Sequence, residues 1–282
     1  MRKTIFGLAL FTTLALAQNP PATGRGGPPN LATQQIKPGL FMISGAGANT
    51  EVRVTNDGLI VVDGKLPGDE IYTALMAQIK AISTQPIRYL IVTQYHADHA
   101  GNNEKFLAAG VQLIAQKNLN INLTRTAAKG LATITYDREY TLKLGGVEVR
   151  LFHAGNAHTS GDTMVYFPDL KVVTVSDDVT PPMPGPLADY AGGGSFRDWP
   201  QTLDNVLKLD FDTAIPGNGP PISKLEVKTF RDQIATFVSR AQAAIRKGVP
   251  KDQLMSQLNT DDLGWKARVP NVDPFYADLE KP

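Results

Sequence analysis

The chain has 282 residues, of which 42% are hydrophobic and 20% are charged, as is typical of a soluble globular protein with a full core. Its formal net charge of +1 gives no reason to expect nucleic acid or an anionic membrane as a partner. The absence of cysteine excludes disulfides and thiolate ligands, so nitrogen and oxygen atoms must hold any metal ion.

The first residues predict a signal peptide over 1–17. A basic segment at 1–3 precedes an apolar run at 5–16, and Ala15-Leu16-Ala17 forms a small-x-small cleavage pattern before Gln18. The apolar run is too short to span a bilayer, although an uncleaved membrane anchor is the alternative interpretation. We therefore expect a periplasmic or secreted protein that has no membrane contact after cleavage.

After a lead-in at 18–30 that is rich in proline and glycine, hydrophobic patterns predict strands and helices in chain order. Short apolar or alternating runs predict strands over Gly39–Ser44, Glu51–Thr55, Leu59–Val62, Arg88–Thr93, Val111–Ala115, Glu139–Leu144, Val147–Phe152, Thr163–Phe167, Lys171–Val175 and Phe211–Ile215. Helical spacing predicts helices over Asp69–Ser83, Asn103–Ala109, Trp199–Leu207 and Leu225–Arg246.

Two turns and one long loop punctuate these elements. Asn56-Asp57-Gly58 and Gly145-Gly146 each predict a hairpin, because such residues tolerate positive φ. The segment Pro181–Ser195 predicts an irregular loop that covers a functional site. The order of elements favours a single domain over 31–282, with two sheets inside and helices outside.

Ligand-type side chains collect where predicted strands end. After the strand at Arg88–Thr93, two histidines and an aspartate occur within four residues, and imidazole and carboxylate suit divalent metal ions. Further candidates follow later strands: His158, Asp177 and the loop around Asn218. A polar loop with ordinary surface histidines is the alternative interpretation of the first cluster.

Four segments together resemble the metallo-β-lactamase superfamily, from about Lys37 to about Ile245. They are Gln94-Tyr95-His96-Ala97-Asp98-His99, Gly155-Asn156-Ala157-His158-Thr159-Ser160-Gly161-Asp162, Ser176-Asp177 and Pro216-Gly217-Asn218-Gly219-Pro220. The resemblance implies an α/β fold, the four-layer αββα sandwich of that family. It also implies that Asp63 is the family's early strand-end aspartate.

The resemblance further implies a metal site, for Zn²⁺ as one or two ions or for another divalent metal. One ion would be held by Gln94, His96 and His158, and the other by Asp98, His99 and Asn218, with Asp177 bridging. Gln94 and Asn218 stand where the family has histidine, and an amide binds Zn²⁺ less strongly than imidazole, so we expect weakened metal binding. Asp178 is the alternative bridging residue.

The implied activity is that of an exported hydrolase, in which a metal-activated water attacks an amide, lactam, lactone or ester of a small-molecule substrate. Asp98 would orient the water and shuttle its proton, and Tyr190 would stabilise the oxyanion if the covering loop brings it in. An exposed loop tyrosine is the alternative for Tyr190. For the whole protein, the alternatives are a non-catalytic binding protein with a degenerate metal site and, more remotely, an iron-dependent redox protein.

Overall fold

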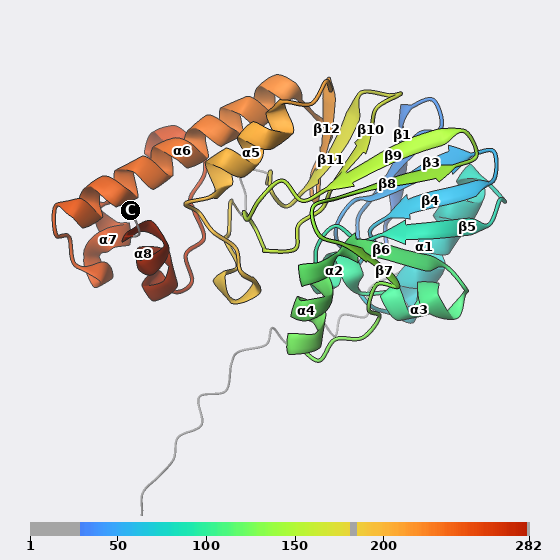
Figure 1. Cartoon of the computed structure of the whole chain (residues 1–282), viewed down its shortest axis with the longest axis horizontal. Coiled ribbons are helices and arrows are strands. Elements are labelled where there is room, and N and C mark those ends of the chain that lie inside the picture. Colours follow the sequence, from blue (N-terminus) through green and yellow to red (C-terminus); the bar gives the residue numbers. More distant parts are fainter. Residues whose placement is uncertain (1–28, 181–184, 281–282) are drawn as a thin grey trace, which may run out of the picture.

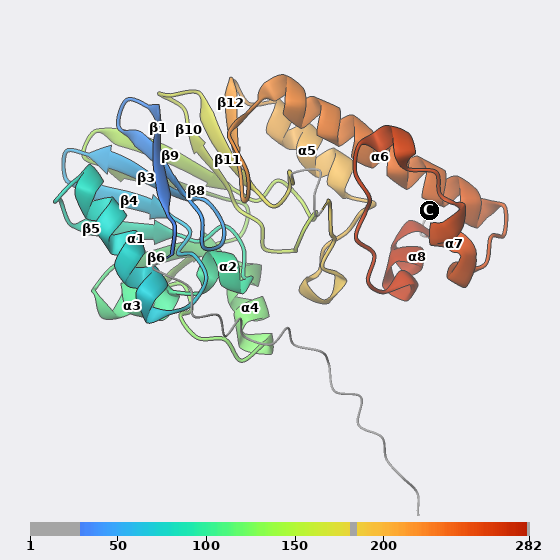
Figure 2. The same ribbon diagram turned by 180° about the vertical axis from the view of Figure 1, so that it is seen from behind.

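The computed structural model describes residues 29–180 and 185–280, and within these ranges the chain forms four layers. Two sheets face each other and helices cover both outer faces, as Figures 1 and 2 show from opposite sides. The predicted αββα sandwich is therefore confirmed. The predicted signal peptide, most of the lead-in and positions 181–184 of the predicted loop lie outside the described residues.

The first sheet has seven strands whose spatial order follows the chain. They are β1 (Ala32–Lys37), β2 (Leu40–Ser44), β3 (Thr50–Thr55), β4 (Gly58–Val62), β5 (Ile87–Ile91), β6 (Gln112–Gln116) and β7 (Ile134–Tyr136). β1 to β4 pair antiparallel, and β4 to β7 pair parallel. Thr55 lies opposite Gly58, which confirms the predicted hairpin.

The second sheet has six strands in the order β13-β12-β11-β10-β9-β8. They are β8 (Glu139–Leu144), β9 (Val147–Phe152), β10 (Met164–Phe167), β11 (Val172–Ser176), β12 (Thr213–Pro216) and β13 (Ile222–Ser223). β11 and β12 are parallel, so their carboxyl ends meet at one edge of the sheet. Leu144 pairs with Val147 around Gly145 and Gly146, both at positive φ, which confirms the second predicted hairpin.

The helices flank the two sheets. They are α1 (Asp69–Ile82), α2 (Ala97–Ala100), α3 (Asn103–Ala108), α4 (Lys117–Arg125), α5 (Trp199–Leu207), α6 (Lys224–Arg246), α7 (Lys251–Gln257) and α8 (Val272–Glu280), with 3₁₀ turns at Tyr190–Gly192 and Asp261–Leu263. α1, α3 and α4 bury apolar side chains against the first sheet, and α5, α6 and α8 do so around the second. No helix within the described ranges has the length and hydropathy needed to cross a membrane.

The core between the sheets explains why the central strands are apolar on both faces. Ile60 and Val62 of β4 pack there with Val149 and Val165 of the second sheet, and none of the four is exposed. Alternate residues of β4, such as Val61, face the helices on the other side, so the whole strand is buried. Such two-sided burial anchors the strand ends that carry the polar groups.

Several elements are absent from the predicted set: β1, β7, β13, α2, α4, α7 and α8. β1 is a largely exposed edge strand of polar sequence that is fixed by pairing with β2. α4 contains three asparagines and one threonine, which have low helix propensity, and it buries Leu119 and Leu123 one turn apart. In both cases tertiary contacts outweigh a weak local signal.

Candidate metal centre

The candidate centre lies where strands of the two sheets end. His96, Asp98 and His99 follow β5, with His96 at the N-cap of α2. His158 lies in the loop between β9 and β10, and Asp177 directly follows β11. Because the buried strands fix the bases of these loops, residues more than 80 positions apart meet at one edge of the sandwich.

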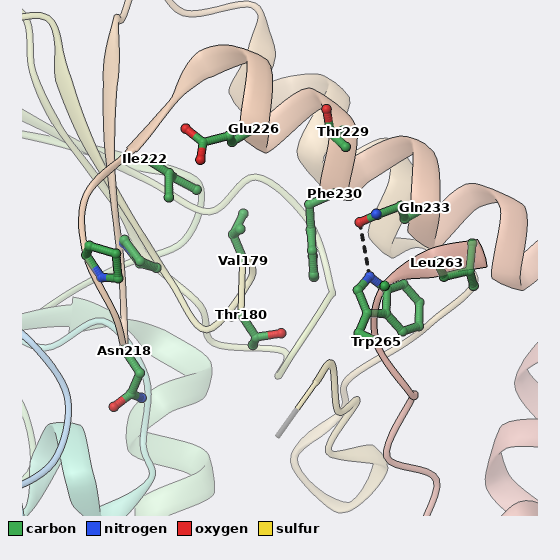
Figure 3. A pocket seen from close by; sticks show the side chains of 13 residues that line it. Val179, Thr180, Asn218, Ile222, Glu226, Thr229, Phe230, Gln233, Leu263 and Trp265 are labelled. Atoms are coloured by element: carbon green, nitrogen blue, oxygen red, sulfur yellow. Dashed lines mark hydrogen bonds between the residues drawn. The ribbon is translucent and has the colours of Figure 1, made fainter. Parts of the chain in front are cut away.

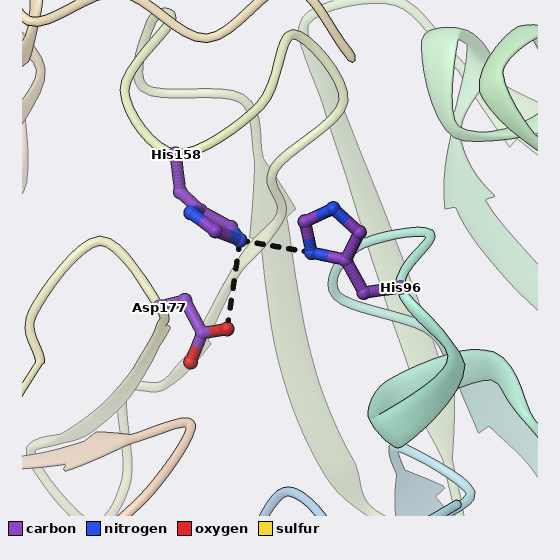
Figure 4. A group of neighbouring side chains, drawn as sticks. All are labelled: His96, His158 and Asp177. Atoms are coloured by element: carbon purple, nitrogen blue, oxygen red, sulfur yellow. Dashed lines mark hydrogen bonds and ion pairs between the residues drawn. The ribbon is translucent and has the colours of Figure 1, made fainter. Parts of the chain in front are cut away.

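Five side chains form two overlapping groups, each suited to hold a metal ion. One is His96, His158 and Asp177, and the other is Asp98, His99 and Asp177, with ligand atoms within 4.8 Å of one another in each group. Figure 4 shows the first group, with the two imidazoles and the carboxylate pointing toward a common space. Asp177 belongs to both groups, which is the position required of a bridging ligand.

The outer nitrogen of each imidazole has a partner that fixes the ring. His158 Nδ1 lies 2.7 Å from the Leu187 carbonyl, and His99 Nδ1 lies 2.7 Å from Asp63 Oδ2. His96 Nε2 lies 3.1 Å from Asp189 Oδ2. An acceptor at each outer nitrogen requires a proton there, so the inner nitrogens of His96 and His158 present lone pairs to the common space when these imidazoles are neutral, whereas His99 Nε2 faces the Asp177 carboxylate at 3.2 Å.

These lone pairs favour a cation between them. His96 Nδ1 and His158 Nε2 face each other at 3.0 Å, and two acceptor nitrogens at that distance repel unless a proton or metal ion lies near both. Asp177 Oδ2 is 3.6 Å from His158 Nε2 and 3.2 Å from His99 Nε2. The donor set of three imidazoles and two carboxylates fits Zn²⁺ or a similar divalent ion.

The charges of His99 and Asp177 stabilise each other. Burial disfavours ionised His99, but the adjacent Asp63 and Asp177 carboxylates outweigh it and raise the pKa of His99 well above its ordinary value. Burial likewise opposes ionisation of Asp177, and the charge and hydrogen bond of His99 hold the pKa of Asp177 far below its ordinary value. The surroundings of the candidate centre therefore stabilise an ionised Asp177 carboxylate next to a positive charge.

Asp63 is the support of His99 and not a ligand. It ends β4 at φ 59 and accepts hydrogen bonds from Thr93 N at 2.8 Å and Thr93 Oγ1 at 2.6 Å. Thr93 Oγ1 is also 2.8 Å from Ser176 Oγ, which precedes Asp177. This chain of contacts ties both sheets together behind the metal ligands.

Asp178, the alternative bridging residue, points elsewhere. It is fully buried, and its Oδ1 accepts from the His158 backbone N–H at 3.3 Å. Burial and the neighbouring Asp162 raise the pKa of Asp178 well above its ordinary value. The structure thus brings Asp177, and not Asp178, to both ligand groups.

Gln94 does not present a ligand atom in this conformation, which corrects the expectation from its position in the motif. Its Oε1 accepts from the His96 backbone N–H at 2.9 Å, and its Nε2 donates to Asp177 Oδ2 at 2.9 Å. Because a backbone N–H is only a donor, the amide oxygen must face it and the amide nitrogen must face the carboxylate. Ligation through Oε1 would require the amide to turn over.

Asn218 lies in the loop that runs beside the second group. Its neighbour Gly217 is so close that an added Cβ would overlap Asp177 Oδ1 and lie 3.1 Å from His99 Cε1. Asn218 also lines an adjoining cavity, where its side chain points away from Trp265 (Figure 3). The loop that carries it is therefore in the predicted place.

Tyr190 is not brought to the ligand groups, in contrast to its expected role. Its hydroxyl donates to Asp278 Oδ2 of α8 at 3.2 Å, and its ring packs with the core around α6. The preceding residue, Asp189, is the one that reaches His96, and it also accepts a hydrogen bond from Tyr95 Oη.

Sequence reasoning missed Asp189, since it selects the loop but not the residue that points inward. Burial opposes ionisation of Asp189, but the hydrogen bonds from His96 and Tyr95 outweigh it and lower the pKa of its carboxyl.

Comparison with known proteins supports the family resemblance and the fold. The family model of the metallo-beta-lactamase superfamily matches residues 46–218. The alpha subunit of 2,4-dinitroanisole O-demethylase from a Nocardioides species is 24% identical over 82% of this chain and 71% of its own length. The type 2 metallo-beta-lactamase of Elizabethkingia meningoseptica is 27% identical over 57% of this chain and 64% of its own.

A longer relative and two solved structures complete the comparison. The linear primary-alkylsulfatase of a Pseudomonas species is 23% identical over 72% of this chain, which spans 48% of that protein. The metallo-beta-lactamase from Pontibacter korlensis superposes with a TM-score of 0.66 at 16% identity, covering 73% of this chain and 99% of its own. The DIM-1 metallo-beta-lactamase gives 0.65 at 19% identity, with 74% and 98% covered.

Proposed function

The chain belongs to the metallo-beta-lactamase superfamily, and from this premise we propose that it is an exported, zinc-dependent hydrolase of a small molecule. The observation that carries the proposal is the inward orientation of three imidazoles around Asp177, each fixed by a partner on its outer nitrogen. The predicted leader at 1–17 supports export to the periplasm or beyond.

When bound, a divalent ion at this position supplies a Lewis acid and lowers the pKa of water toward neutrality. His96, His99, His158 and Asp177 would hold it. Asp98 has an exposed side-chain fraction of 32% and lies 3.6 Å from His99 Nε2, so its carboxylate reaches both the ligand group and solvent. We assign to Asp98 the orientation of the attacking water and the uptake of its proton.

The chemistry of a metal-activated water indicates which kind of substrate bond would be broken. A water poised beside carboxylates attacks an acyl carbon, so we propose an amide, lactam, lactone or ester as substrate. The relatives are named for lactamase, alkylsulfatase and O-demethylase activities, which supports hydrolysis while leaving the substrate to the loops of each protein.

One observation favours a second candidate, a binding protein with a degenerate metal site. The Gln94 amide hydrogen-bonds to Asp177 and so uses a carboxylate oxygen that a metal ion would otherwise take. In such a protein, the hydrogen bond from Gln94 Nε2 to Asp177 would take the place of a bond between Asp177 and a metal ion.

Metal analysis and a hydrolysis screen together decide between the two. Protein purified without chelator is examined for metal by elemental analysis, as wild type and as Asn218→His, and is assayed on aryl esters, lactones and β-lactams. We expect about one equivalent of zinc in wild type, rising toward two in Asn218→His, because imidazole is the stronger donor.

Hydrolysis should stop on chelation and in His96→Ala. Absence of metal from both proteins, together with absence of turnover in the presence of zinc, would reject the hydrolase and support the binding protein.

A further inference from the structure

A cavity of about 380 Å³ lies beside the loop that carries Asn218 (Figure 3). Its walls come from the segment after β11, from the loop between β12 and β13, from α6 and from the 3₁₀ turn near Trp265. A volume of this size suits part of a small molecule.

The cavity and the metal ligands share one short segment. Pro216 and Asn218 line the cavity, and Gly217 between them lies against Asp177 and His99. The loop that borders the cavity is therefore also in contact with two of the candidate metal ligands.

The lining of the cavity is mainly apolar and rigid. Val179, Ile222 and Phe230 point into it, and the rings of Phe230 and Trp265 have centroids 6.2 Å apart. Trp265 Nε1 donates to Gln233 Oε1 at 3.1 Å, which fixes the indole ring. A preformed wall of aromatic and branched side chains binds an apolar group without ordering the protein first.

Glu226, which is among the lining residues, gives this cavity a negative charge. Its Oε2 accepts from Ser223 N and Ser223 Oγ, both at 2.7 Å, as the capping box of α6. These hydrogen bonds keep the pKa of the Glu226 carboxyl below its ordinary value, so it is ionised at neutral pH. No lysine or arginine is among the described residues that line the cavity.

Resting on the proposed hydrolase function, we propose that the cavity receives an uncharged apolar group, such as a phenyl ring, next to the scissile bond, and that Glu226 discriminates against anionic groups. Phe230, Gln233 and Trp265 lie outside the family match at 46–218, so this selectivity belongs to the chain's own C-terminal part. The substrate class is a neutral aryl or branched-alkyl acyl compound.

Three esters with the same leaving group test the proposal: 4-nitrophenyl acetate, 4-nitrophenyl phenylacetate and its 4-carboxyphenylacetyl analogue. In zinc-loaded wild type we expect kcat/KM for the phenylacetate to exceed that for the acetate by about tenfold or more. Ile222→Trp, which fills the cavity, should abolish that preference and keep acetate hydrolysis. Leu225→Trp, a substitution at a position that is 71% exposed, is the matched control and should keep the preference.

Glu226→Gln removes the charge and keeps a side chain that can cap α6. It should raise kcat/KM for the carboxylated ester about tenfold and leave the uncharged phenylacetate unchanged. An unchanged ratio between these two esters in Glu226→Gln would overturn the charge discrimination. Retention of the phenyl preference in Ile222→Trp would overturn the assignment of the cavity.

Calorimetric measurement of phenylacetamide binding to the metal-free protein tests the cavity proposal independently of the hydrolase proposal. Binding that is lost in Ile222→Trp and kept in Leu225→Trp supports the cavity even if no ester is hydrolysed, in which case only the hydrolase proposal fails. Ester turnover without any binding of phenylacetamide and without a phenyl preference rejects the cavity and leaves the hydrolase standing.

Discussion

At the scale of single residues, the partner of an imidazole decides which of its nitrogens faces the candidate metal position. Asp189 accepts from His96 Nε2 and so leaves Nδ1 as the inward lone pair. The Leu187 carbonyl does the same for His158 through the opposite nitrogen, and Asp63 orients the His99 ring through Nδ1 so that Nε2 faces Asp177. The capacity of this site to hold a metal ion therefore depends on residues outside the two candidate ligand groups.

Asp189→Asn tests this dependence. An amide that donates to His96 Nε2 would move the imidazole proton to Nδ1, where it blocks coordination, so we expect zinc affinity to fall about 10- to 100-fold. Competition with a chromophoric chelator measures the change. Asp212→Asn, with a side chain 58% exposed in the Lys37 ion pair, serves as the control. Equal affinities of Asp189→Asn and wild type would contradict the role of Asp189.

At the scale of elements, the loop between β12 and β13 is a wall of both the metal centre and the cavity. β12 ends at Pro216 beside β11, so their parallel pairing brings the loop to Asp177. Asn49 Nδ2 holds the loop by donating to the carbonyls of Pro216 and Gly219, both at 2.9 Å. A fixed loop at this place leaves no room for a side chain at Gly217.

Gly217→Ala should therefore displace the Asp177 carboxylate. Because Asp177 belongs to both ligand groups, we expect zinc affinity to fall about tenfold or more, with a smaller change in thermal stability. Gly248→Ala is the control, since its Cβ meets nothing within 4 Å although its φ of +78 carries backbone strain. Metal stoichiometry and calorimetric unfolding measure both effects. An unchanged zinc affinity in Gly217→Ala would show that the loop can move to accommodate the added methyl group.

At the scale of the whole molecule, the sandwich buries ionisable groups as well as apolar ones. Glu51 of β3 is 1% exposed, and burial, followed by repulsion from Asp63, raises its pKa well above the ordinary 4.5, against the attraction of Lys65. The folded protein therefore keeps a proton on Glu51 that the unfolded chain loses. This group contributes stability that is present below pH 4.5 and lost as the pH rises toward its folded pKa.

Glu51→Gln removes this titration. We subtract the free energy of unfolding of wild type from that of Glu51→Gln. This difference should increase by about 1.4 kcal/mol per pH unit between pH 4.5 and the folded pKa of Glu51. Urea unfolding of the metal-free proteins at about pH 5 and pH 8 measures the difference. Glu148→Gln, at an exposed ion pair whose carboxyl pKa is lowered, should show no such increase. A constant difference for Glu51→Gln would disprove protonation of Glu51.

The sequence by itself determined the sandwich and five of the residues that the structure brings together at the candidate metal centre. Strong period-2 and period-3.6 patterns marked the strands and helices, because two-sided burial demands continuous apolar strands and one-sided burial demands amphipathic helices. His96, Asp98, His99, His158 and Asp177 follow from short motifs at strand ends. Their residue types are chemically restricted, so the sequence alone points to a metal.

Only the tertiary structure decided how the neighbours of these ligands are used. Asp189 rather than Tyr190 faces the site, the Gln94 amide bonds to Asp177, and Asp178 turns inward to His158, because each orientation depends on partners distant in sequence. β1 and α4 form for the same reason, since pairing and packing outweigh their weak local propensities. A cavity made from several segments has no sequence pattern at all, because its shape exists only once those segments meet.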